Sequence, residues 1–416
     1  MKKSIPFILI CFVQFCFAQV QETSTTPVNI KTVSFTQNNV NAVPIFVLGS
    51  NFQLQFDDLF GNEADYYYEI THCDYNWQPT QIPKAEYLEG FDNQRIQTYS
   101  NSFNTLQLYS HYTLSLPNQN TLGLKLSGNY IITVLNDAKE PVFSRKFILY
   151  EEEVKIPMQI KRARTTANLP YKHNLDFSIN STALTFQNPL KNVKVMLLQN
   201  GKFDTAIKNI APQYTLGNEL VYKYDSETQF WAGNEFLFFE NKDIRASGNN
   251  VAIIDANTAI YGSHLFTHNA RASFPYSFTQ DVNGNFLVNN INGSDNTVEA
   301  DYAWVYFTLS APSFRLDKDI YITGMFNNYA LSEENKMEYN EKKGIYEKAL
   351  LIKQGFTNYE YTVADIKGKI DYENAIDGNF YQTENNYTVL VYYKENTGRY
   401  DRVVGKADLN SINVVN

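Results

Sequence analysis

Hydrophobic and polar residues alternate with a period of two along most of this chain. From residue 30 onward, short alternating runs such as 33–35, 45–48 and 52–56 recur about every ten residues, separated by Asn, Gly and Pro. Successive side chains of a strand point to opposite faces, so this pattern predicts strands with one buried face. A long apolar repeat at helical spacing is absent from the sequence. We therefore expect an all-β protein of tandem immunoglobulin-like, early-set β-sandwich modules.

Composition supports this fold class and excludes several functions. The chain of 416 residues contains 30 Tyr and 29 Phe, and aromatic residues suit pleated, half-buried surfaces. Its net charge of −9 argues against binding nucleic acid, which requires clustered cations, and against docking on anionic lipid. Apart from the start of the chain, no stretch is apolar enough to form a spanning helix. No direct membrane insertion is expected.

The start of the chain predicts export. Lys2 and Lys3 precede the apolar run 5–17, and Ala18 provides the small residue that a signal-peptide cleavage site needs. Cleavage after residue 18 would leave Gln19 as the new terminus and remove two positive charges, which gives a net charge of −11.

Lipid attachment at Cys16 is the alternative at this end of the chain, and the bulky Phe15 before it argues against that alternative. Removal of the signal peptide would also remove Cys11 and Cys16, so Cys73 would be the one cysteine left. An intrachain disulfide would then be impossible.

Turn residues and changes of composition suggest how the chain divides. The predicted segments are a signal peptide (1–18), a flexible arm (19–30), an N-terminal β-sandwich (31–153), a central β-rich domain (154–297), a C-terminal immunoglobulin-like β-sandwich (298–405) and a tail (406–416). The acidic run 151–153 would form a solvated boundary after the first module.

One segment carries an unusually specific set of residues. It begins with His72-Cys73-Asp74-Tyr75-Asn76-Trp77 and continues through 87–90, 110–118 and 127–134. Further matching strings are 199–200, 233–236, 353–356, 384–387 and 400–401. With these residues the chain resembles the plug-protein family of the type IX secretion system. The resemblance implies a non-catalytic periplasmic protein that closes the outer-membrane translocon barrel, with His72, Asp74 and Trp77 as candidate partner contacts.

A second, looser resemblance lies in the C-terminal module. Residues 320–329, 344–346 and 350–355 are similar to early-set immunoglobulin-like modules that bind starch or glycogen. Those modules stack a sugar on an exposed Trp, and Tyr329 occupies that place in this chain. The resemblance implies Asn327, Asn328 and Tyr329 as alternative sugar contacts.

No catalytic residue, cofactor site or metal site is predicted. His72, Cys73 and Asp74 are adjacent on an extended chain, so neighbouring side chains point apart and cannot easily pair as nucleophile and base. Cys73 is expected to be a buried structural residue, with His72 and Asp74 at the polar mouth of a strand. The three tryptophans are interpreted mainly as core residues.

Three other groups of residues receive structural interpretations. His264 and His268 are four residues apart in a predicted strand or loop, where that spacing separates the rings. The segment 281–285 lacks the glycine and glutamate positions of an EF-hand loop and is interpreted as a hairpin turn at Asn283-Gly284. The basic run 161–164 is interpreted as protection of an edge strand, with a charged docking patch as the alternative.

The resemblance to the plug family, together with the absence of a catalytic pattern, implies a non-enzymatic plug that binds and seals the periplasmic opening of the type IX secretion translocon when no substrate is engaged. It would lie in the periplasm at the inner face of the outer membrane, held there by its partner. The alternative is a carbohydrate-binding periplasmic or surface protein that uses the C-terminal module. A membrane barrel is disfavoured because many predicted strands are shorter than the roughly nine to eleven residues needed to span.

Overall fold

The computed structural model describes residues 25–312, 318–412 and 414. The predicted signal peptide (1–18) and the first half of the predicted arm, residues 19–24 of 19–30, lie outside the described residues. Strands contain 45% of the chain and helices 4%, which confirms the all-β prediction against the usual third of residues in helices. Among the described residues, no helix has the length and apolar character needed to cross a membrane.

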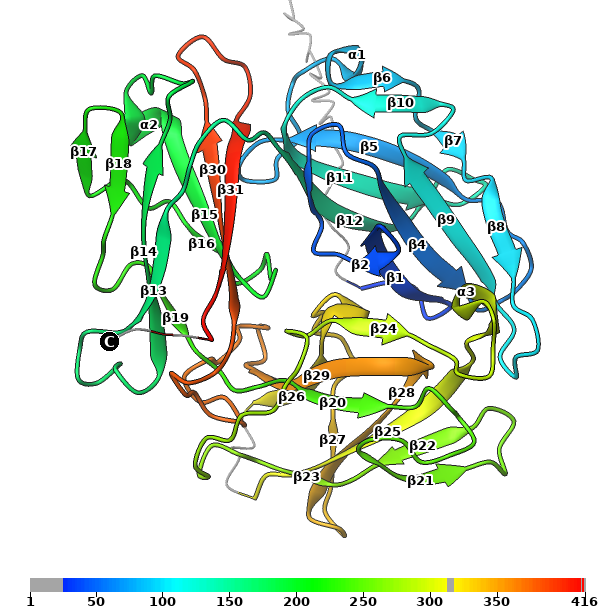
Figure 1. Ribbon diagram of the computed structural model, residues 1–416. Helices are drawn as coiled ribbons and strands as arrows, with labels where there is room; N and C mark the ends of the chain where they lie inside the picture. The colour runs from blue at the N-terminus through cyan, green and yellow to red at the C-terminus, as the bar shows by residue number, and fades with distance from the viewer. Residues whose placement is uncertain (1–24, 313–317, 413, 415–416) are drawn as a thin grey trace, which may run out of the picture.

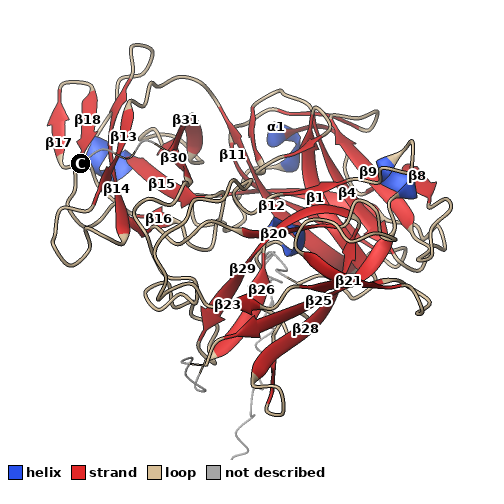
Figure 2. Cartoon of the chain, turned by 60° about the horizontal axis from the view of Figure 1, so that its bottom comes forward, coloured by secondary structure: helices blue, strands red, loops and turns tan. Residues whose placement is uncertain are grey.

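Three β-sandwich domains surround a common centre (Figure 1). The first domain comprises residues 30–153, and the second comprises residues 154–232 together with 384–412. The third domain, residues 233–383, is inserted between the two parts of the second. In the described residues, helices are confined to single turns between strands (Figure 2).

The first domain packs two five-stranded sheets around an aromatic core. One sheet contains β2 (Val40–Asn41), β1 (Ile30–Gln37), β4 (Phe52–Asp58), β9 (Ser110–Leu116) and β8 (Thr98–Asn101). The other contains β3 (Ile45–Val47), β12 (Pro141–Tyr150), β11 (Gly128–Leu135), β5 (Tyr67–Cys73) and β7 (Gln94–Arg95). Between the sheets, Phe46 stacks on Phe52 at 4.3 Å. At one end lie α1 (Lys84–Tyr87), β6 (Leu88–Gly90) and β10 (Thr121–Leu124) (Figure 1).

The second domain is formed from two distant parts of the chain. Its outer sheet contains β13 (Met158–Arg162), β14 (Lys172–Asn180), β18 (Glu219–Tyr222), β17 (Tyr214–Leu216) and β19 (Gln229–Trp231). Its inner sheet contains β16 (Ile207–Lys208), β15 (Val193–Gln199), β30 (Asn386–Tyr393) and β31 (Arg402–Asn410). The short helix α2 (Pro189–Asn192) leads into β15.

The third domain has one sheet centred on β29 (Gly355–Ala364) and another centred on β25 (Tyr302–Ser310). The β29 sheet also contains β20 (Leu237–Glu240), β24 (Phe286–Val288) and β26 (Asp319–Thr323). The β25 sheet also contains β21 (Val251–Asp255), β22 (Gly262–Leu265), β23 (His268–Asn269), β28 (Ile345–Lys353) and β27 (Glu338–Asn340). The single turns α3 (Asn296–Glu299) and η1 (Met325–Asn327) complete it.

The strand pairing differs from the predicted division of the chain. The boundary expected between residues 297 and 298 separates β20 and β24 from β29, with which both pair. Strands β30 and β31, expected in the C-terminal module, pair with the second domain through β15. Residues 406–410, expected in the tail, belong to β31. Local periodicity identifies strands but not their partners, and β15 and β30, for example, pair although they lie almost two hundred residues apart in sequence.

Two strands are buried on both faces, and they bring the first and second domains together. In β11 every residue except Thr133 is buried, and in β30 every residue except Asn386. One face of each strand lies in its own domain's core, while Ile131, Leu390 and Tyr392 meet in a separate cluster between the domains. A strand buried on both faces is apolar without alternation, which explains the continuous apolar runs in these two segments.

Candidate functional site at the domain interfaces

The His72–Trp77 motif forms the end of β5 and the turn after it, at the interface of the first and second domains. Asp74 shapes the turn, because its Oδ1 accepts hydrogen bonds from the backbone N–H groups of Asn76 (2.8 Å) and Gln78 (2.9 Å). Trp77 has a φ of +66°, a left-handed conformation that is uncommon for a bulky residue. The turn places Tyr75 and Trp77 against the second domain.

Tyr75 makes several polar contacts across this interface. Its hydroxyl donates to the carbonyl oxygen of Val195 (2.6 Å) and accepts from the N–H of Asn209 (3.1 Å). Its backbone N–H donates to Asp401 (3.2 Å), and its ring meets Tyr392 edge to face at 4.9 Å. Burial raises the pKa of Tyr75 to about 12, so the phenol stays protonated and keeps donating.

An apolar cluster surrounds Tyr75. Trp77 is buried and packs edge to face on Phe203 of the second domain at 5.5 Å. Cys73 is fully buried in the same cluster, as the sequence predicted. Burial, with a smaller contribution from the charge of Asp74, raises the pKa of the Cys73 thiol to about 12. A protonated, inaccessible thiol is a poor nucleophile.

His72 is buried rather than at a polar strand mouth, and this corrects the sequence-based interpretation. Its ring lies edge to face on Tyr130 of the first domain (5.0 Å) and on Tyr400 of the second (5.5 Å). Its Nδ1 lies 2.9 Å from Thr80 Oγ1. Burial lowers the pKa of His72 to about 4, so the ring is neutral at physiological pH. His72, Asp74 and Trp77 thus contribute to the joint between two domains of this chain.

A buried ion pair joins the first and third domains. The Asp57 carboxylate on β4 lies 2.7 Å from the Lys353 ammonium at the end of β28, and both side chains are almost fully buried. Asp57 also contacts His111 Nδ1 (2.6 Å) and accepts a hydrogen bond from the Tyr302 hydroxyl (2.6 Å). The Lys353 ammonium lies 4.1 Å from the centre of the Tyr109 ring.

Electrostatics at this pair favour the ionised carboxylate. Burial by itself would raise the pKa of Asp57, but the charge of Lys353 and the contact with His111 lower it below its usual value. A second carboxylate supports the same interface, since Asp301 accepts the backbone N–H groups of Leu106 (2.5 Å) and Gln107 (3.1 Å). The first and third domains are therefore joined by buried, mutually satisfied polar groups.

The predicted sugar-contact residues lie where all three domains meet. Asn327 is occupied by the backbone of its own turn, because its side chain accepts from the Gly324 N–H (3.1 Å) and donates to the Ile322 carbonyl (2.9 Å). The Lys202 ammonium of the second domain lies 4.7 Å from the centre of the Tyr329 ring. Asn328 and Tyr329 line a pocket of about 80 Å³ between the domains. Tyr329 is thus an interface residue and not an exposed stacking platform.

The remaining residues singled out in the sequence have structural partners. His264 stacks on Tyr306 at 4.2 Å, whereas His268 lies 2.9 Å from Asp377. The turn at Asn283-Gly284 is present with positive φ at both residues, but the hairpin prediction is wrong, since β24 after the turn pairs with β29. Trp304 is 38% exposed and is not a core residue.

The basic run 161–164 begins in β13, which is an edge strand as predicted. Lys161 pairs with Asp176 at 2.7 Å, and Arg164 pairs with Asp225 at 2.5 Å. The guanidinium of Arg162 lies 3.7 Å from the centre of the Tyr381 ring. These contacts favour the edge-strand interpretation over a free docking patch.

One group of carboxylates among the described residues could hold a metal ion. Glu235, Asp281 and Glu384 each offer an oxygen, and these oxygens lie within 4.8 Å of one another. Sequence analysis missed this group because its members lie in three separate segments. Glu235 and Glu384 do, however, fall in two of the strings that carry the family resemblance.

Sequence reasoning also missed the Asp57–Lys353 pair and the role of Tyr75. A signal was present, because the resemblance strings 353–356 and 400–401 contain Lys353 and Asp401. Both residues are now seen to contact the first domain. These two strings therefore include residues at the joints between domains.

Comparison with known proteins gives one family match. The family described as "Type 9 secretion system plug protein 1st domain" matches residues 30–151, which coincide with the first domain. No curated protein matches the chain.

Among solved structures, the chain is similar to a hypothetical protein from Parabacteroides merdae, with 31% identity and a TM-score of 0.87. That similarity covers 93% of this chain and 98% of the other. A biofilm-associated protein BSP domain, with 8% identity and a TM-score of 0.18 over 94% of this chain and 60% of the other, is too dissimilar to inform the fold.

The family match, the all-β fold and the position of the family motif in the first domain agree. The first domain of the chain, residues 30–151, belongs to the type 9 secretion system plug protein family.

Proposed function

We propose that this protein is a periplasmic plug that binds and seals the periplasmic opening of the type IX secretion translocon when no substrate is engaged. The observation that carries the proposal is the match of the first domain to the plug family. The partner would be the outer-membrane translocon barrel of that system. The family is named for a secretion plug and not for an enzymatic activity.

The domain interfaces support a mechanical role. A barrel wide enough for folded cargo leaks small solutes when idle, so its lumen must be blocked by a bulky body. Here Tyr75 joins the first and second domains and Asp57–Lys353 joins the first and third, while Lys202 and Glu360 form an ion pair of 2.5 Å between the second and third. Joints between all three pairs of domains oppose independent domain motion.

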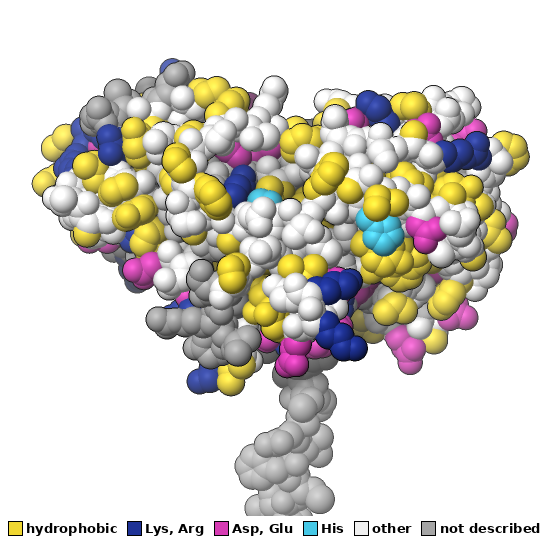
Figure 3. Space-filling model, turned by 90° about the horizontal axis from the view of Figure 1, so that it is seen from below, with side chains coloured by type: hydrophobic (Ala, Val, Ile, Leu, Met, Phe, Trp, Pro, Cys, Tyr) yellow, Lys and Arg dark blue, Asp and Glu magenta, His cyan; other side chains and the backbone are white. Residues whose placement is uncertain are grey.

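The face at the bottom of Figure 1, which Figure 3 shows from below, fits a protein partner better than a polyanion. In Figure 3, positive and negative side chains are scattered over this face among neutral and hydrophobic ones, without a field of one sign. Nucleic-acid binding would instead need a basic stripe.

Occupancy of the barrel would follow mass action. If plug and cargo require exclusive barrel states, binding of either one shifts the equilibrium against the other.

The test is isolation of the tagged translocon barrel from cells with and without a stalled substrate. We expect this protein in idle barrels and its loss from barrels that hold cargo. Deletion of the gene should leave the barrel assembled but open, so that the outer membrane admits large antibiotics, and a strain with the gene restored is the control. Equal amounts of the protein in both barrel samples, with a tight membrane after deletion, would refute the proposal.

A further inference from the structure

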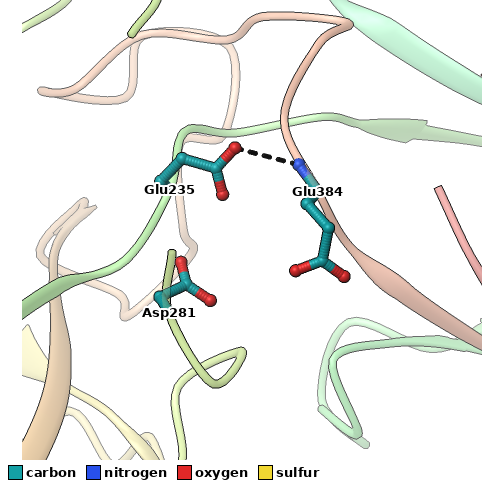
Figure 4. A group of neighbouring side chains, drawn as sticks. All are labelled: Glu235, Asp281 and Glu384. Carbon is teal, nitrogen blue, oxygen red and sulfur yellow. Dashed lines mark hydrogen bonds between the residues drawn. The ribbon is translucent and has the colours of Figure 1, made fainter. Parts of the chain in front are cut away.

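Three acidic side chains meet where the chain passes between the second and third domains. Glu235 lies on the segment that leaves the second domain, and Glu384 lies on the segment that returns to it just before β30. Asp281 comes from the loop that precedes β24 of the third domain. Figure 4 shows the three carboxylates facing a common space, although they originate from three separate segments.

None of the three carboxylates forms an ion pair among the described residues, and the charge of Arg271, which pairs with Asp377, only partly offsets the effect of burial on the pKa of Asp281. Glu235 is 1% exposed, and its Oε1 accepts hydrogen bonds from the Tyr276 hydroxyl and from the Glu384 N–H (3.1 Å). Its Oε2 is buried and has no hydrogen-bond partner in the described structure. Within the same part of the chain, no Lys or Arg side chain forms an ion pair with any of the three acids.

The neighbouring hydrogen-bond donors hold the carboxylate oxygens in place. Asp281 accepts the backbone N–H groups of Phe236 (2.6 Å) and Asn283 (2.8 Å), which hold its carboxylate in place. The Asn283 side chain donates to Glu384 at 3.1 Å, while its Oδ1 is a second buried oxygen without a partner among the described residues. Burial raises the pKa of Glu235 to about 7, and the pKa values of Asp281 and Glu384 are also raised by burial.

We propose that Glu235, Asp281 and Glu384 bind a calcium ion that ties the second domain to the third. Ca²⁺ takes six to eight oxygen ligands at about 2.3–2.6 Å, so two ligands on opposite sides of the ion lie up to about 5.2 Å apart. The three oxygens all lie within 4.8 Å of one another, which is close enough for one such ion. Mg²⁺ keeps several of its waters and is usually held by one or two carboxylates, so a group of three protein carboxylates suits Ca²⁺ better.

The two buried oxygens that lack partners gain a role in this site. Glu235 Oε2 becomes a ligand, the Asn283 amide oxygen is available as a fourth, and water completes the coordination. A divalent cation also removes the repulsion among three carboxylates in a buried place, which otherwise requires that one of them take up a proton. Because the ligands come from both domains, binding would stiffen the connection between them.

The test uses the mature protein after removal of divalent ions with a chelator. Calorimetric titration with CaCl₂ should show one site, and thermal unfolding should shift upward in Ca²⁺ at concentrations up to about 10 mM. Glu235→Gln and Glu384→Gln keep the side-chain shape and should weaken Ca²⁺ binding by about 10-fold or more. Glu333→Gln is the matched control, because that side chain is 89% exposed, and it should bind Ca²⁺ like the natural protein.

Two further measurements keep the proposal open to refutation if a variant fails to fold. Asp281→Asn can replace Glu235→Gln as the ligand variant. In the natural protein, Tb³⁺ should show tyrosine-sensitised emission, because Tyr276 touches Glu235, and Ca²⁺ should displace it. Absence of Ca²⁺ binding to the natural protein, Tb³⁺ emission that Ca²⁺ leaves unchanged, or ligand variants that bind as well as Glu333→Gln would overturn the proposal. The site is independent of the plug role, so its failure would leave that proposal standing.

Discussion

Lys353→Met tests whether the buried ion pair holds the first and third domains together. Methionine keeps the length and apolar stem of the lysine but leaves the Asp57 carboxylate without its cation. The side chains of Lys353 and Asp57 are 3% and 0% exposed, so water cannot replace the lost partner. Removing one member of a buried pair costs about 3–5 kcal/mol, because the other charge stays buried and uncompensated.

The double variant Asp57→Asn with Lys353→Met should be less damaging than the sum of the two single changes. It removes both charges, and replacement of a whole buried pair by neutral groups often costs little. We expect the coupling between the two positions to be about 2–3 kcal/mol in a double-mutant cycle. The free energy of unfolding would be measured by urea denaturation with circular dichroism.

The pH dependence provides a second measurement on the same variants. The folded pKa of Asp57 is below its unfolded value, so the stability it contributes is present above the unfolded pKa and is lost as pH falls through the folded pKa. In Lys353→Met the lowering influence of the ammonium is gone and burial raises that pKa. The variant should therefore approach the natural protein in stability as the pH falls from 7 toward the acidic range.

Lys348→Met is the matched control on the same strand. The Lys348 ammonium lies 3.5 Å from Glu338, and although the Lys348 side chain is 17% exposed, the Glu338 side chain is 83% exposed, so water can solvate the carboxylate that loses its partner. Exposed pairs contribute about 0–1 kcal/mol, so this change should have little effect. A cost below about 1 kcal/mol for Lys353→Met, or strictly additive effects in the cycle, would refute the buried-pair argument.

Three further predictions follow from single buried groups. Tyr75→Phe removes a hydroxyl with two interdomain hydrogen bonds and should cost about 1–3 kcal/mol in thermal unfolding, whereas Tyr222→Phe should be neutral or stabilising, because that buried hydroxyl has no partner among the described residues. Cys73 should react slowly with a thiol reagent in the native protein and quickly in urea, and fast native labelling would contradict its burial. When a chelator has removed divalent ions, burial raises the pKa of Glu235 in the folded protein to about 7. The stability that the protonated side chain contributes is therefore fully present below the unfolded pKa and is lost as pH rises through about 7. Glu235→Gln should reduce the change in the free energy of unfolding across this pH range by about 2–3 kcal/mol. An unchanged dependence of that free energy on pH would be evidence against the raised pKa of Glu235.

The sequence by itself determined the fold class and the buried, structural character of Cys73. Alternation in runs such as 52–56 predicts a strand with one buried face, and β4 has that form. Cys73 was predicted to be buried because it ends an aromatic strand without an activating cation, and the structure confirms this. These conclusions depend on neighbouring residues along the chain, which share one strand and one environment.

Tertiary structure alone decided how the strands are divided among domains. The segment 386–393 predicts a strand equally well in either of two modules, and only its pairing with 193–199 assigns it to the second domain. The same limit applies to His72 and Tyr329, which were expected at exposed contacts. Each is covered by a residue of another domain, Tyr400 and Lys202 respectively, that no local pattern places beside it.

The group of three carboxylates shows most clearly why some features follow from the sequence and others only from the tertiary structure. The segment around Asp281 lacks the spacing of a calcium loop, and by itself it gives no reason to expect a metal. Its possible ligands, Glu235 and Glu384, are separated by 149 residues in sequence and meet because the third domain is inserted between two strands of the second. Periodicity reports the environment of each strand, whereas a site assembled from three segments depends on chain connectivity and long-range pairing, which determine distances that no local pattern contains.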